Sequence, residues 1–397
     1  MTKTTAVLFL DVEGGWGGSS RSLYYLVKYL ARDNLLPIVV LRKDGPVKEH
    51  YKKLGITCLI APEMASFRPA DRKNFVAFTL YLWSMRKYFS FRKKIKMLVK
   101  EYNIGLIHVN HESLSLTGSL VAWELGLPWV AHVRTLLTPG WFAKLVYKII
   151  ANYSSHTIFI TEPNLNHFKS LVGSSFNMIK TSIIYNITPE SFKDSALQEM
   201  EGSENKFRVL SLTNFAPSRG VDRIIDIATE LKNRGESDFL FYLYGKSSHS
   251  SVITGRPDKY FENLKQRVKT LGLTSNVFFM GHTIYPEKAL AGCDVLLKLT
   301  RQSNPWGRDI MEALAAGVPI ITLGKFTEFV ENGVNGYINA DYNVDDIVDE
   351  LVKLSNSKEL CSIISNANRQ KARALFNGED CSQEVRHIYS KVIKDQN

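Results

Sequence analysis

Short apolar runs alternate with longer amphipathic segments along the whole chain. In the first half the apolar runs lie at 6–12, 37–42, 58–62, 105–110, 128–133, 156–161 and 182–186. Between most of them apolar residues recur at three- and four-residue spacing, as in RSLYYLVKYLARDN, which is typical of a helix with one buried face. Strands that are apolar throughout and separated by helices predict a parallel sheet covered by helices on both faces.

A polar stretch at 188–206 interrupts this pattern, and the pattern then starts again. The stretch TPESFKDSALQEMEGSENK contains turn formers and no strand-like run. Further apolar runs follow at 208–213, 240–245, 277–281, 294–299, 319–324 and 336–340. Because 397 residues also exceed what one hydrophobic core usually supports, we expect two doubly wound Rossmann-like domains of the α/β class. We place them at 1–190 and 207–365, with a linker at 191–206 and C-terminal helices at 366–397 that pack back towards the N-terminal domain.

The composition is that of a globular protein, and its cysteines indicate a reducing compartment. No apolar run reaches the roughly 18 residues that cross a membrane. The apolar start of the chain is broken by Asp11, too early for a signal peptide. The four cysteines are scattered without a C-x-x-C pair, which argues against a zinc site or a disulfide framework. We therefore expect a cytoplasmic protein.

The net charge of +11 is concentrated in the first half of the chain. Residues 1–190 contain 24 Lys and Arg against 12 Asp and Glu, whereas residues 191–397 contain 26 against 27. Such a one-sided field predicts an anionic partner for the first domain, which is a membrane surface, a lipid phosphate or nucleic acid. The sequence carries no signature of a nucleic-acid-binding module, so we do not expect nucleic acid as the partner.

A glycine-rich segment, EGGWGGSSRSLYYL, follows the first predicted strand. Glycines allow the backbone to approach a ligand, and the helix that follows offers N–H groups to an anion, so Gly17 and Gly18 are candidate binding residues. The segment departs from the dinucleotide-binding fingerprint, because Ser20 stands where a third glycine is required. The alternative is an ordinary strand-to-helix turn with Ser19 or Ser20 as its N-cap.

The first strand of the second half is followed by TNFAPSRGVDRIIDIATEL. Arg219 and Gly220 lie at the entrance of the predicted helix in this segment. A guanidinium at the positive end of a helix suits a diphosphate, because both supply hydrogen-bond donors to the same oxygens. The alternative is a solvated arginine on a surface turn.

A third segment, RQSNPWGRDIMEALAAGVPII, combines a polar cluster with a helix of small residues. Asn304 and Glu312 in this segment are separated by a loop and the first helical turn. A carboxylate packed among small residues needs hydrogen-bond partners, and ribose hydroxyls would supply them. The alternative is a structural ion pair between Glu312 and Arg308, one helical turn away.

Together the three segments resemble the family 4 glycosyltransferases, which have the GT-B fold of two Rossmann-like domains facing across a cleft. NPWGRDIMEALAAGVP is similar to the family's Glu-x7-Glu region and its Glu-Ala-x-Ala-x-Gly-x-Pro tail, with Trp306-Gly307 in the Phe-Gly position. The glycine-rich loop and the Arg219-Gly220 pair are similar to two further family motifs. The resemblance covers most of residues 6–340.

The chain also departs from the family at specific positions. Asn304 replaces the first Glu, Asn214 replaces a usual Arg, and Arg219 replaces a usual Lys. In the first domain Arg134 takes the position of a usual His, with His132 two residues earlier. A guanidinium only donates hydrogen bonds, whereas the Asn amide both donates and accepts. The sugar that is recognised is therefore the property that these exchanges affect most.

The resemblance implies a retaining hexosyltransferase that moves a sugar from a nucleotide diphosphate to a glycan or a lipid-linked saccharide, in bacterial polysaccharide or lipopolysaccharide assembly. It implies neither metal nor cofactor, and the sequence has no Asp-x-Asp motif for a divalent ion. The catalytic residues carried over are Arg219, Arg134 and His132. The donor-binding residues carried over are Gly17, Gly18, Asn214, Arg219, Asn304, Trp306, Gly307, Arg308 and Glu312.

Two histidines, His108 and His111, lie at the end of a first-domain strand in GLIHVNHES. The end of such a strand points at the cleft, so both are candidates for the acceptor side. A purely structural role is the alternative, because a lone histidine at a strand end is more often structural than chemical.

Residues 68–102 contain ten Lys and Arg interleaved with aromatic residues at helical spacing. This pattern is typical of a helix lying on anionic lipid, so we expect peripheral contact with the inner face of the cell membrane. The alternative is a pair of ordinary amphipathic helices that cover the sheet, with solvated lysines outside.

Two other functions stay open at this point. A sugar-nucleotide epimerase uses the same two-domain fold. A non-catalytic module that binds a nucleotide sugar or a glycan would account for the substituted Asn304 and Asn214. Release of nucleoside diphosphate from a donor separates an enzyme from a binding module.

Overall fold

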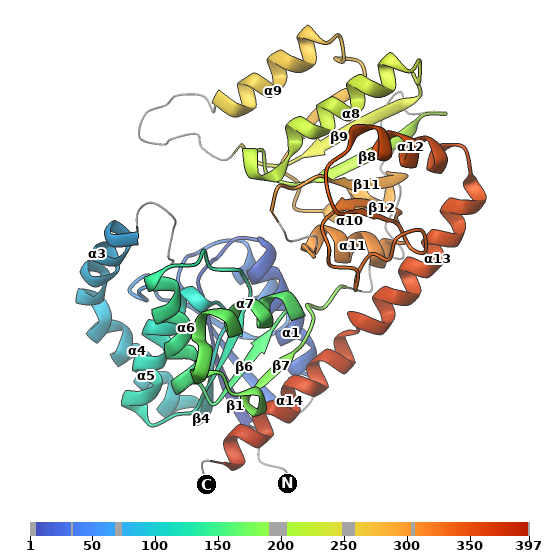
Figure 1. Ribbon diagram of the computed structural model, residues 1–397. Coiled ribbons are helices and arrows are strands. Elements are labelled where there is room, and N and C mark those ends of the chain that lie inside the picture. The colour runs from blue at the N-terminus through green and yellow to red at the C-terminus, as the bar shows by residue number, and fades with distance from the viewer. Residues whose placement is uncertain are drawn as a thin grey trace. The chain divides into compact units, whose positions relative to one another are not determined.

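The computed structural model describes residues 5–32, 35–67, 74–189, 205–247, 259–302 and 306–395 (Figure 1). These residues form two compact units of parallel α/β structure. The first unit comprises Met1–Ile187 together with Asn377–Asn397, and the second comprises Thr188–Phe376. None of the helices within the described ranges is both long and apolar enough to cross a bilayer.

A parallel sheet of seven strands forms the centre of the first unit. The strands are β1 (Thr5–Asp11), β2 (Leu35–Leu41), β3 (Thr57–Ile60), β4 (Ile104–Val109), β5 (Trp129–Val133), β6 (His156–Phe159) and β7 (Thr181–Ile183). Their spatial order is β3-β2-β1-β4-β5-β6-β7. The order changes direction between β1 and β4, so the loops after these two strands diverge and open a binding position at the carboxyl edge.

Helices cover both faces of this sheet, because alternate residues of the strands point to opposite sides. Val7 and Phe9 face one side, where they join a core with α1 (Gly18–Leu30), α2 (Val47–Lys53) and α14 (Gly378–Lys394). Leu8 and Leu10 face the other side and belong to a second core. The helices on that side are α3 (Asn74–Ser84), α4 (Tyr88–Tyr102), α5 (Ser115–Leu125), α6 (Trp141–Tyr153) and α7 (Glu162–Val172).

The second unit is built around a parallel sheet of six strands in the order β10-β9-β8-β11-β12-β13. The strands are β8 (Phe207–Leu212), β9 (Phe239–Tyr244), β10 (Val277–Gly281), β11 (Val295–Lys298), β12 (Ile320–Leu323) and β13 (Tyr337–Asn339). The helices are α8 (Val221–Asn233), α9 (Lys259–Thr270), α10 (Pro286–Ala291), α11 (Arg308–Ala316), α12 (Val344–Ser355) and α13 (Lys358–Leu375). Here the order changes direction between β8 and β11. Every apolar run predicted as a strand coincides with one of the strands, so the predicted doubly wound α/β class is confirmed.

The units divide the chain at positions that differ from the predicted boundaries. The predictions were 190 and 365, whereas the divisions fall after Ile187 and after Phe376. The helix α13 continues through position 365 and packs on α11, so it stays with the second unit. The helix α13 ends at Leu375, and the side chain of Asn377 then caps α14 by accepting a hydrogen bond from the Glu379 backbone N–H at 2.8 Å. Most of the predicted linker, residues 191–204 of 191–206, lies outside the described residues.

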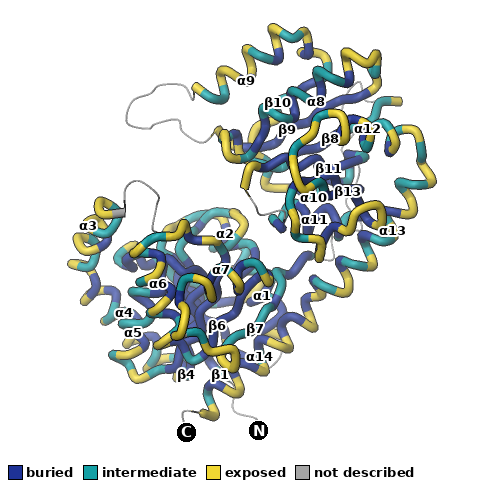
Figure 2. Tube along the Cα trace, in the orientation of Figure 1, coloured by how far each residue is buried: buried dark blue, intermediate teal, exposed yellow. Residues whose placement is uncertain are grey.

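In both units the sheets are deeply buried, and the outer segments alternate between buried, intermediate and exposed residues (Figure 2). The strands consist largely of buried side chains, while the exposed positions lie mainly on helices and loops. In Figure 2 the exposed class also follows much of α3, although the sequence of this helix, NFVAFTLYLWS, is largely apolar.

Candidate functional site

In the second unit, Arg219 lies on a short turn (η6, Pro217–Arg219) between β8 and α8. Gly220, which follows it, has a φ of +70°, and a Cβ there would lie 1.9 Å from the backbone oxygen of Leu299. Glycine is therefore required for the turn to pack on the end of β11. The Arg219 side chain is half-buried, and none of the described residues forms a hydrogen bond or an ion pair with it.

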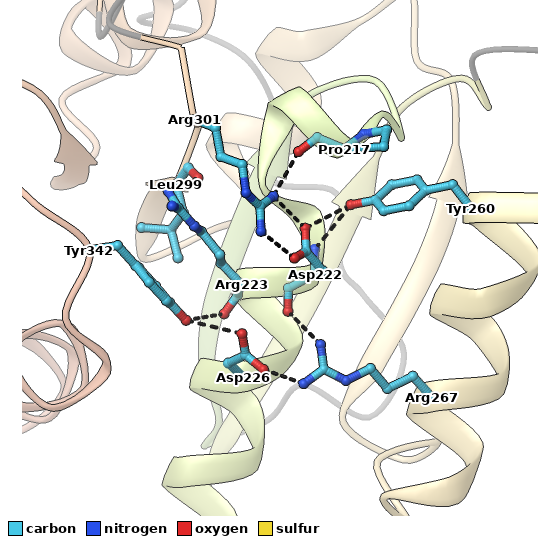
Figure 3. Close-up of polar contacts among 9 residues, drawn as sticks. All are labelled: Pro217, Asp222, Arg223, Asp226, Tyr260, Arg267, Leu299, Arg301 and Tyr342. Carbon is cyan, nitrogen blue, oxygen red and sulfur yellow. Dashed lines mark hydrogen bonds and ion pairs between the residues drawn. The ribbon is translucent and has the colours of Figure 1, made fainter.

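Arg301, in the loop after β11, holds this turn in place (Figure 3). Its guanidinium donates to the Pro217 backbone oxygen at 2.7 Å and to the Asp222 carboxylate at 2.8 and 2.5 Å. The Tyr260 hydroxyl donates to the same carboxylate at 2.8 Å. Burial acts to raise the pKa of Asp222, but the hydrogen bonds from Arg301 and Tyr260 outweigh it and hold that pKa below its ordinary value. Sequence reasoning missed this contact, because its partners are far apart in the chain.

The predicted ribose anchor, Glu312, lies on α11 and is paired with Arg308. The Arg308 Nε donates to the Glu312 Oε1 at 2.9 Å, and only 8% and 2% of these two side chains are exposed. This ion pair is the structural alternative that the sequence left open. It holds the carboxylate in one orientation, so any contact between Glu312 and a ligand has to be made alongside Arg308.

A second buried ion pair lies at the start of α11, and sequence reasoning did not find it. Lys298, the last residue of β11, donates to the Asp309 carboxylate at 2.7 Å, with 7% and 13% of the two side chains exposed. A Cβ on Gly307 would lie 2.2 Å from the Asp309 Oδ1 and 2.3 Å from the Lys298 Nζ. A side chain at position 307 would therefore displace this ion pair. The available sequence signal was a lysine within the apolar run DVLLKL.

The remaining residues predicted to bind the donor are not part of these ion pairs. Asn214 is exposed, and its side-chain oxygen accepts a hydrogen bond from the Lys246 backbone N–H at 3.2 Å. Trp306 is buried, with its ring centroid 5.5 Å from that of Phe326 in an edge-to-face contact, so it packs the loop. Asn304 lies outside the described residues.

In the first unit, a buried polar network lies at the carboxyl ends of β1, β4 and β5. Arg134 donates from Nε to the Asn110 backbone oxygen at 2.9 Å and from Nη1 to the Asn186 side-chain oxygen at 2.6 Å. Asn110 in turn donates to Asp11 at 2.9 Å, and Ser20 donates to the same carboxylate at 2.7 Å. The predicted catalytic Arg134 is therefore buried and bonded within its own unit, although its neighbours lie at the predicted edge of the sheet.

The network continues from Arg134 through two histidines to α14. Arg134 Nη2 lies 3.2 Å from Nδ1 of His132, and this nitrogen lies 3.3 Å from Nε2 of His108. The Tyr389 hydroxyl lies 2.6 Å from Nδ1 of His108. Because an arginine can only donate, Nδ1 of His132 accepts, and the network assigns the His132 proton to Nε2. This Nε2 is buried and has no hydrogen-bond partner in the described part of the chain.

His108 and His111, predicted for the acceptor side, are both buried. His111 accepts a hydrogen bond from the Ser113 backbone N–H at 3.1 Å and caps the short helix η2 (Glu112–Leu114). His108 is bonded through both ring nitrogens. These are the surroundings of structural histidines, and a direct contact of His108 with an acceptor would require its ring to give up a hydrogen bond.

We expect the first unit to lose stability as the pH falls below about 6.5, the usual pKa of His. Burial lowers the pKa of His108 to about 3 and that of His156 to about 4, and lowers that of His132 as well. The unfolded chain then binds more protons than the folded one, so stability is complete above pH 6.5 and declines below it by about 1.4 kcal/mol per pH unit for each histidine.

Urea unfolding at several pH values, monitored by tryptophan fluorescence, checks this expectation. The signal reports mainly on the first unit, because five of the six tryptophans lie at or before Trp141. The His156→Gln variant should show a smaller loss of stability on acidification. His387→Gln, at an exposed position, is the matched control and should behave like the wild type. An equal slope in the His156 variant would contradict the assignment.

The glycine-rich loop needs glycine at a position other than the predicted ones. A Cβ on Gly14 would lie 2.2 Å from the Lys43 backbone oxygen, whereas a Cβ on Gly15 or Gly17 would have no neighbour within 4 Å. Gly17 is the N-cap of α1 and Gly18 its first residue, both exposed. The alternative with a serine N-cap is therefore wrong, and exposed backbone N–H groups remain at this helix start.

We expect Gly14→Ala to destabilise the first unit by about 1–3 kcal/mol, because an overpacked backbone contact has to open. Gly15→Ala is the matched control and should change stability by less than about 0.5 kcal/mol. Denaturant midpoints measure both variants. Equal stability of the Gly14 and Gly15 variants would show that the close approach of Lys43 does not require glycine.

Within the described ranges, no group of three His, Cys, Asp or Glu side chains could hold a metal ion. Metal independence stays a prediction, as does the expectation that no cofactor takes part.

Comparison with known proteins places the two halves of the chain in related families. The model of Glycosyltransferase Family 4 matches residues 16–189, and the model of Glycosyl transferases group 1 matches residues 193–371. Among solved structures, HepE from Anabaena in complex with UDP has a TM-score of 0.77 and 21% identity, covering 98% of this chain and 100% of that one. This likeness supports the fold.

Two curated relatives extend the comparison. The poly(ribitol-phosphate) alpha-N-acetylglucosaminyltransferase of Staphylococcus aureus (strain COL) is 23% identical over 278 residues, 68% of this chain and 51% of that protein. The chain thus spans about half the length of that relative. An uncharacterized glycosyltransferase of Methanocaldococcus jannaschii is 23% identical over 313 residues, 75% of this chain and 78% of that protein.

Proposed function

Because this chain belongs to glycosyltransferase family 4, we propose that it transfers a hexosyl group from a nucleotide-diphosphate sugar with retention of the anomeric configuration. The acceptor is a glycan or a lipid-linked saccharide, and the product enters a bacterial surface polysaccharide or lipopolysaccharide. The reaction takes place in the cytoplasm and uses neither a metal ion nor a cofactor.

The observation that carries this proposal is the Arg219 turn. The turn is anchored by Gly220 on Leu299 and by Arg301 on Pro217, while the Arg219 guanidinium has no partner among the described residues. It lies where the strand order changes direction, which is where open α/β sheets bind ligands. A fixed cation at this position suits the charge that develops on a departing diphosphate.

The remaining assignments in the second unit follow from the same chemistry. The backbone N–H groups at the start of α11 contribute to diphosphate binding, since Gly307 caps this helix without a side-chain hydrogen bond. Glu312 accepts hydrogen bonds from the ribose while Arg308 holds its carboxylate in place. Asn304 contacts the sugar, and the exposed Asn214 contributes an uncharged contact where the family usually has a cation.

In the first unit, the backbone N–H groups at Gly17 and Gly18 also face an anionic group of the substrate. His132 supplies a donor to a substrate oxygen, because its Nε2–H is buried and has no partner among the described residues. Arg134 acts with it by holding Nδ1 of His132 as an acceptor. His108 supports the same ring, and His111 completes the acceptor side.

Relatives support a nucleotide-sugar substrate. The staphylococcal relative is named as an N-acetylglucosaminyltransferase, and HepE has been solved with UDP and with UDP-glucose. A thermal-shift screen of UDP, GDP, dTDP, ADP and CMP sugars identifies the donor of this chain. A ligand at about 100 times its dissociation constant adds about 2.7 kcal/mol of stability.

Turnover is then measured as nucleoside diphosphate released from the stabilising donor, with NMR detection of the sugar. A transferase releases diphosphate slowly even without acceptor, and the first anomer to appear matches the donor. An epimerase would instead produce the epimeric sugar, and a binding module would release nothing. Either of the last two results, or no shift with any nucleotide sugar, would contradict the proposed function.

A further inference from the structure

The helix α3 exposes an apolar face. Its outward positions include five large hydrophobic side chains, which are Phe75, Val76, Leu80, Leu82 and Trp83, with exposures between 52% and 74%. At 100° per residue these positions fall within one half of the helix circumference. The opposite half carries Tyr81, which is buried in the core, and Ala77 and Phe78, which pack against it. The helix therefore has one apolar face on the protein and a second one towards solvent.

An apolar outer face is unusual for a helix on the surface of a globular protein. A surface helix normally turns charged and polar residues outward, and a helix that is hydrophobic all round is normally buried. Monomeric proteins rarely leave contiguous apolar patches exposed, and such patches mark sites of interaction. The ordinary amphipathic helix that the sequence also allowed would have placed only polar residues at these positions.

Exposed cations lie on the segment that follows this face. The segment that follows, η1 (Met85–Lys87) and α4, exposes Arg86, Lys87, Lys93, Lys96 and Lys100, and on the same stripe of α4 it exposes Phe89 and Met97. The Arg86 guanidinium lies 4.4 Å from the centre of the Trp83 ring, which joins the charged and apolar parts. From 74 to 100 the sequence contains seven Lys and Arg and no Asp or Glu.

Part of this charge is neutralised by the protein, and most of it faces solvent. Arg92 and Lys94 form ion pairs with Glu124 and Glu63 at 2.6 Å each. These pairs tie α4 to the rest of the first unit. The five exposed cations project from the outer surface, where they can reach an anionic partner.

We propose that this surface, the exposed side chains of α3, η1 and α4, docks on an anionic lipid bilayer. The outer face of α3 lies in the interface between headgroups and acyl chains, and the lysines of α4 contact lipid phosphates. Aliphatic side chains such as Val76, Leu80 and Leu82 select hydrocarbon over nucleic acid, whose bases stack on aromatic rings. A second copy docked through the same face would place like charges opposite one another.

The proposal is independent of the sugar that is transferred, because binding is measured without substrate. The full chain is sedimented with vesicles of phosphatidylcholine, alone or mixed with phosphatidylglycerol. We expect binding to the anionic vesicles, weakened by salt. Lys93→Gln, Lys96→Gln and Lys100→Gln together should lower the binding constant about a hundredfold, at about 1 kcal/mol per lysine near the surface. The matched control combines Lys259→Gln, Lys269→Gln and Lys358→Gln, at exposed positions of the second unit, and should bind like the wild type.

A second set of variants tests the apolar contact. Phe75→Ser, Leu80→Ser and Trp83→Ser together should abolish sedimentation while circular dichroism and the melting temperature stay unchanged, because all three side chains point outward. Brominated lipids should quench the wild-type fluorescence more than that of Trp83→Phe.

Three results would overturn the proposal. The first is a wild-type protein that does not bind anionic vesicles. The second is binding that depends on the lysines alone and survives the serine variants, since any basic protein binds in that way. The third is a concentration-dependent dimer, detected by light scattering and removed by the serine variants, because a second copy would then be the partner of this surface.

Discussion

Replacement of Arg219 by Ala is expected to lower kcat by about 10²–10³, the usual cost of removing one fixed donor from developing negative charge. The side chain has no partner among the described residues, so its removal leaves no buried group unsatisfied and should not change the melting temperature. The turn itself is held by Gly220 and Arg301, which stay in place. Diphosphate release under saturating donor measures the loss.

The matched variant for this experiment is Arg219→Lys. Lysine keeps the charge and is the residue usual at this position in the family, so most of the turnover should return. If Arg219 acted only through the bidentate hydrogen bonds of its guanidinium, the ammonium group of lysine would not restore turnover. Near-wild-type turnover of Arg219→Ala would show that the diphosphate is stabilised elsewhere.

Replacement of Glu312 by Ala is expected to have two separate effects. It leaves the nearly buried Arg308 cation without its partner, which costs about 3–5 kcal/mol of stability. It also removes the proposed ribose contact, so the nucleotide sugar should no longer stabilise the protein. Hydrogen exchange of the β11 and β12 amides measures the first effect in the second unit, and the thermal shift measures the second.

A double variant separates the two roles of Glu312. Arg308→Met with Glu312→Leu replaces the ion pair by apolar side chains of similar volume and should recover most of the lost stability. If nucleotide binding stays absent in this stable protein, the carboxylate itself contacts the donor. If binding returns, the ion pair serves only the structure, and the assignment of Glu312 to the ribose is wrong.

The strands were predictable because parallel strands buried on both faces leave continuous apolar runs. PIITLG and DVLLKL, for example, correspond to β12 and β11. Ion pairs between residues close in the sequence could also be predicted, since Arg308 and Glu312 are one helical turn apart. Chain order alone, however, does not disclose which strands become neighbours.

The contacts that the sequence did not predict join residues that only the tertiary structure brings together. Lys298 meets Asp309 across a loop, and Gly220 meets Leu299 only because β8 and β11 are neighbours in the sheet. The surroundings of Arg134 depend on the same kind of information. Its partner Asn110 directly follows the neighbouring strand β4, and His108 is held by Tyr389 from the far end of the chain. In each case the sequence shows the polar or glycine residue itself, but it does not show which residue it contacts.

The position of α14 has a consequence for the order of folding. This helix completes the first unit, where Val385, Tyr389 and Val392 fill the core against α1 and the sheet. It is also synthesised after the whole second unit. While the ribosome is still making residues 188–376, the domain made first has an uncovered apolar face and a histidine without its tyrosine partner. The N-terminal half is therefore the first to emerge and the last to be finished, and a chaperone that acts during synthesis would meet it on that open face.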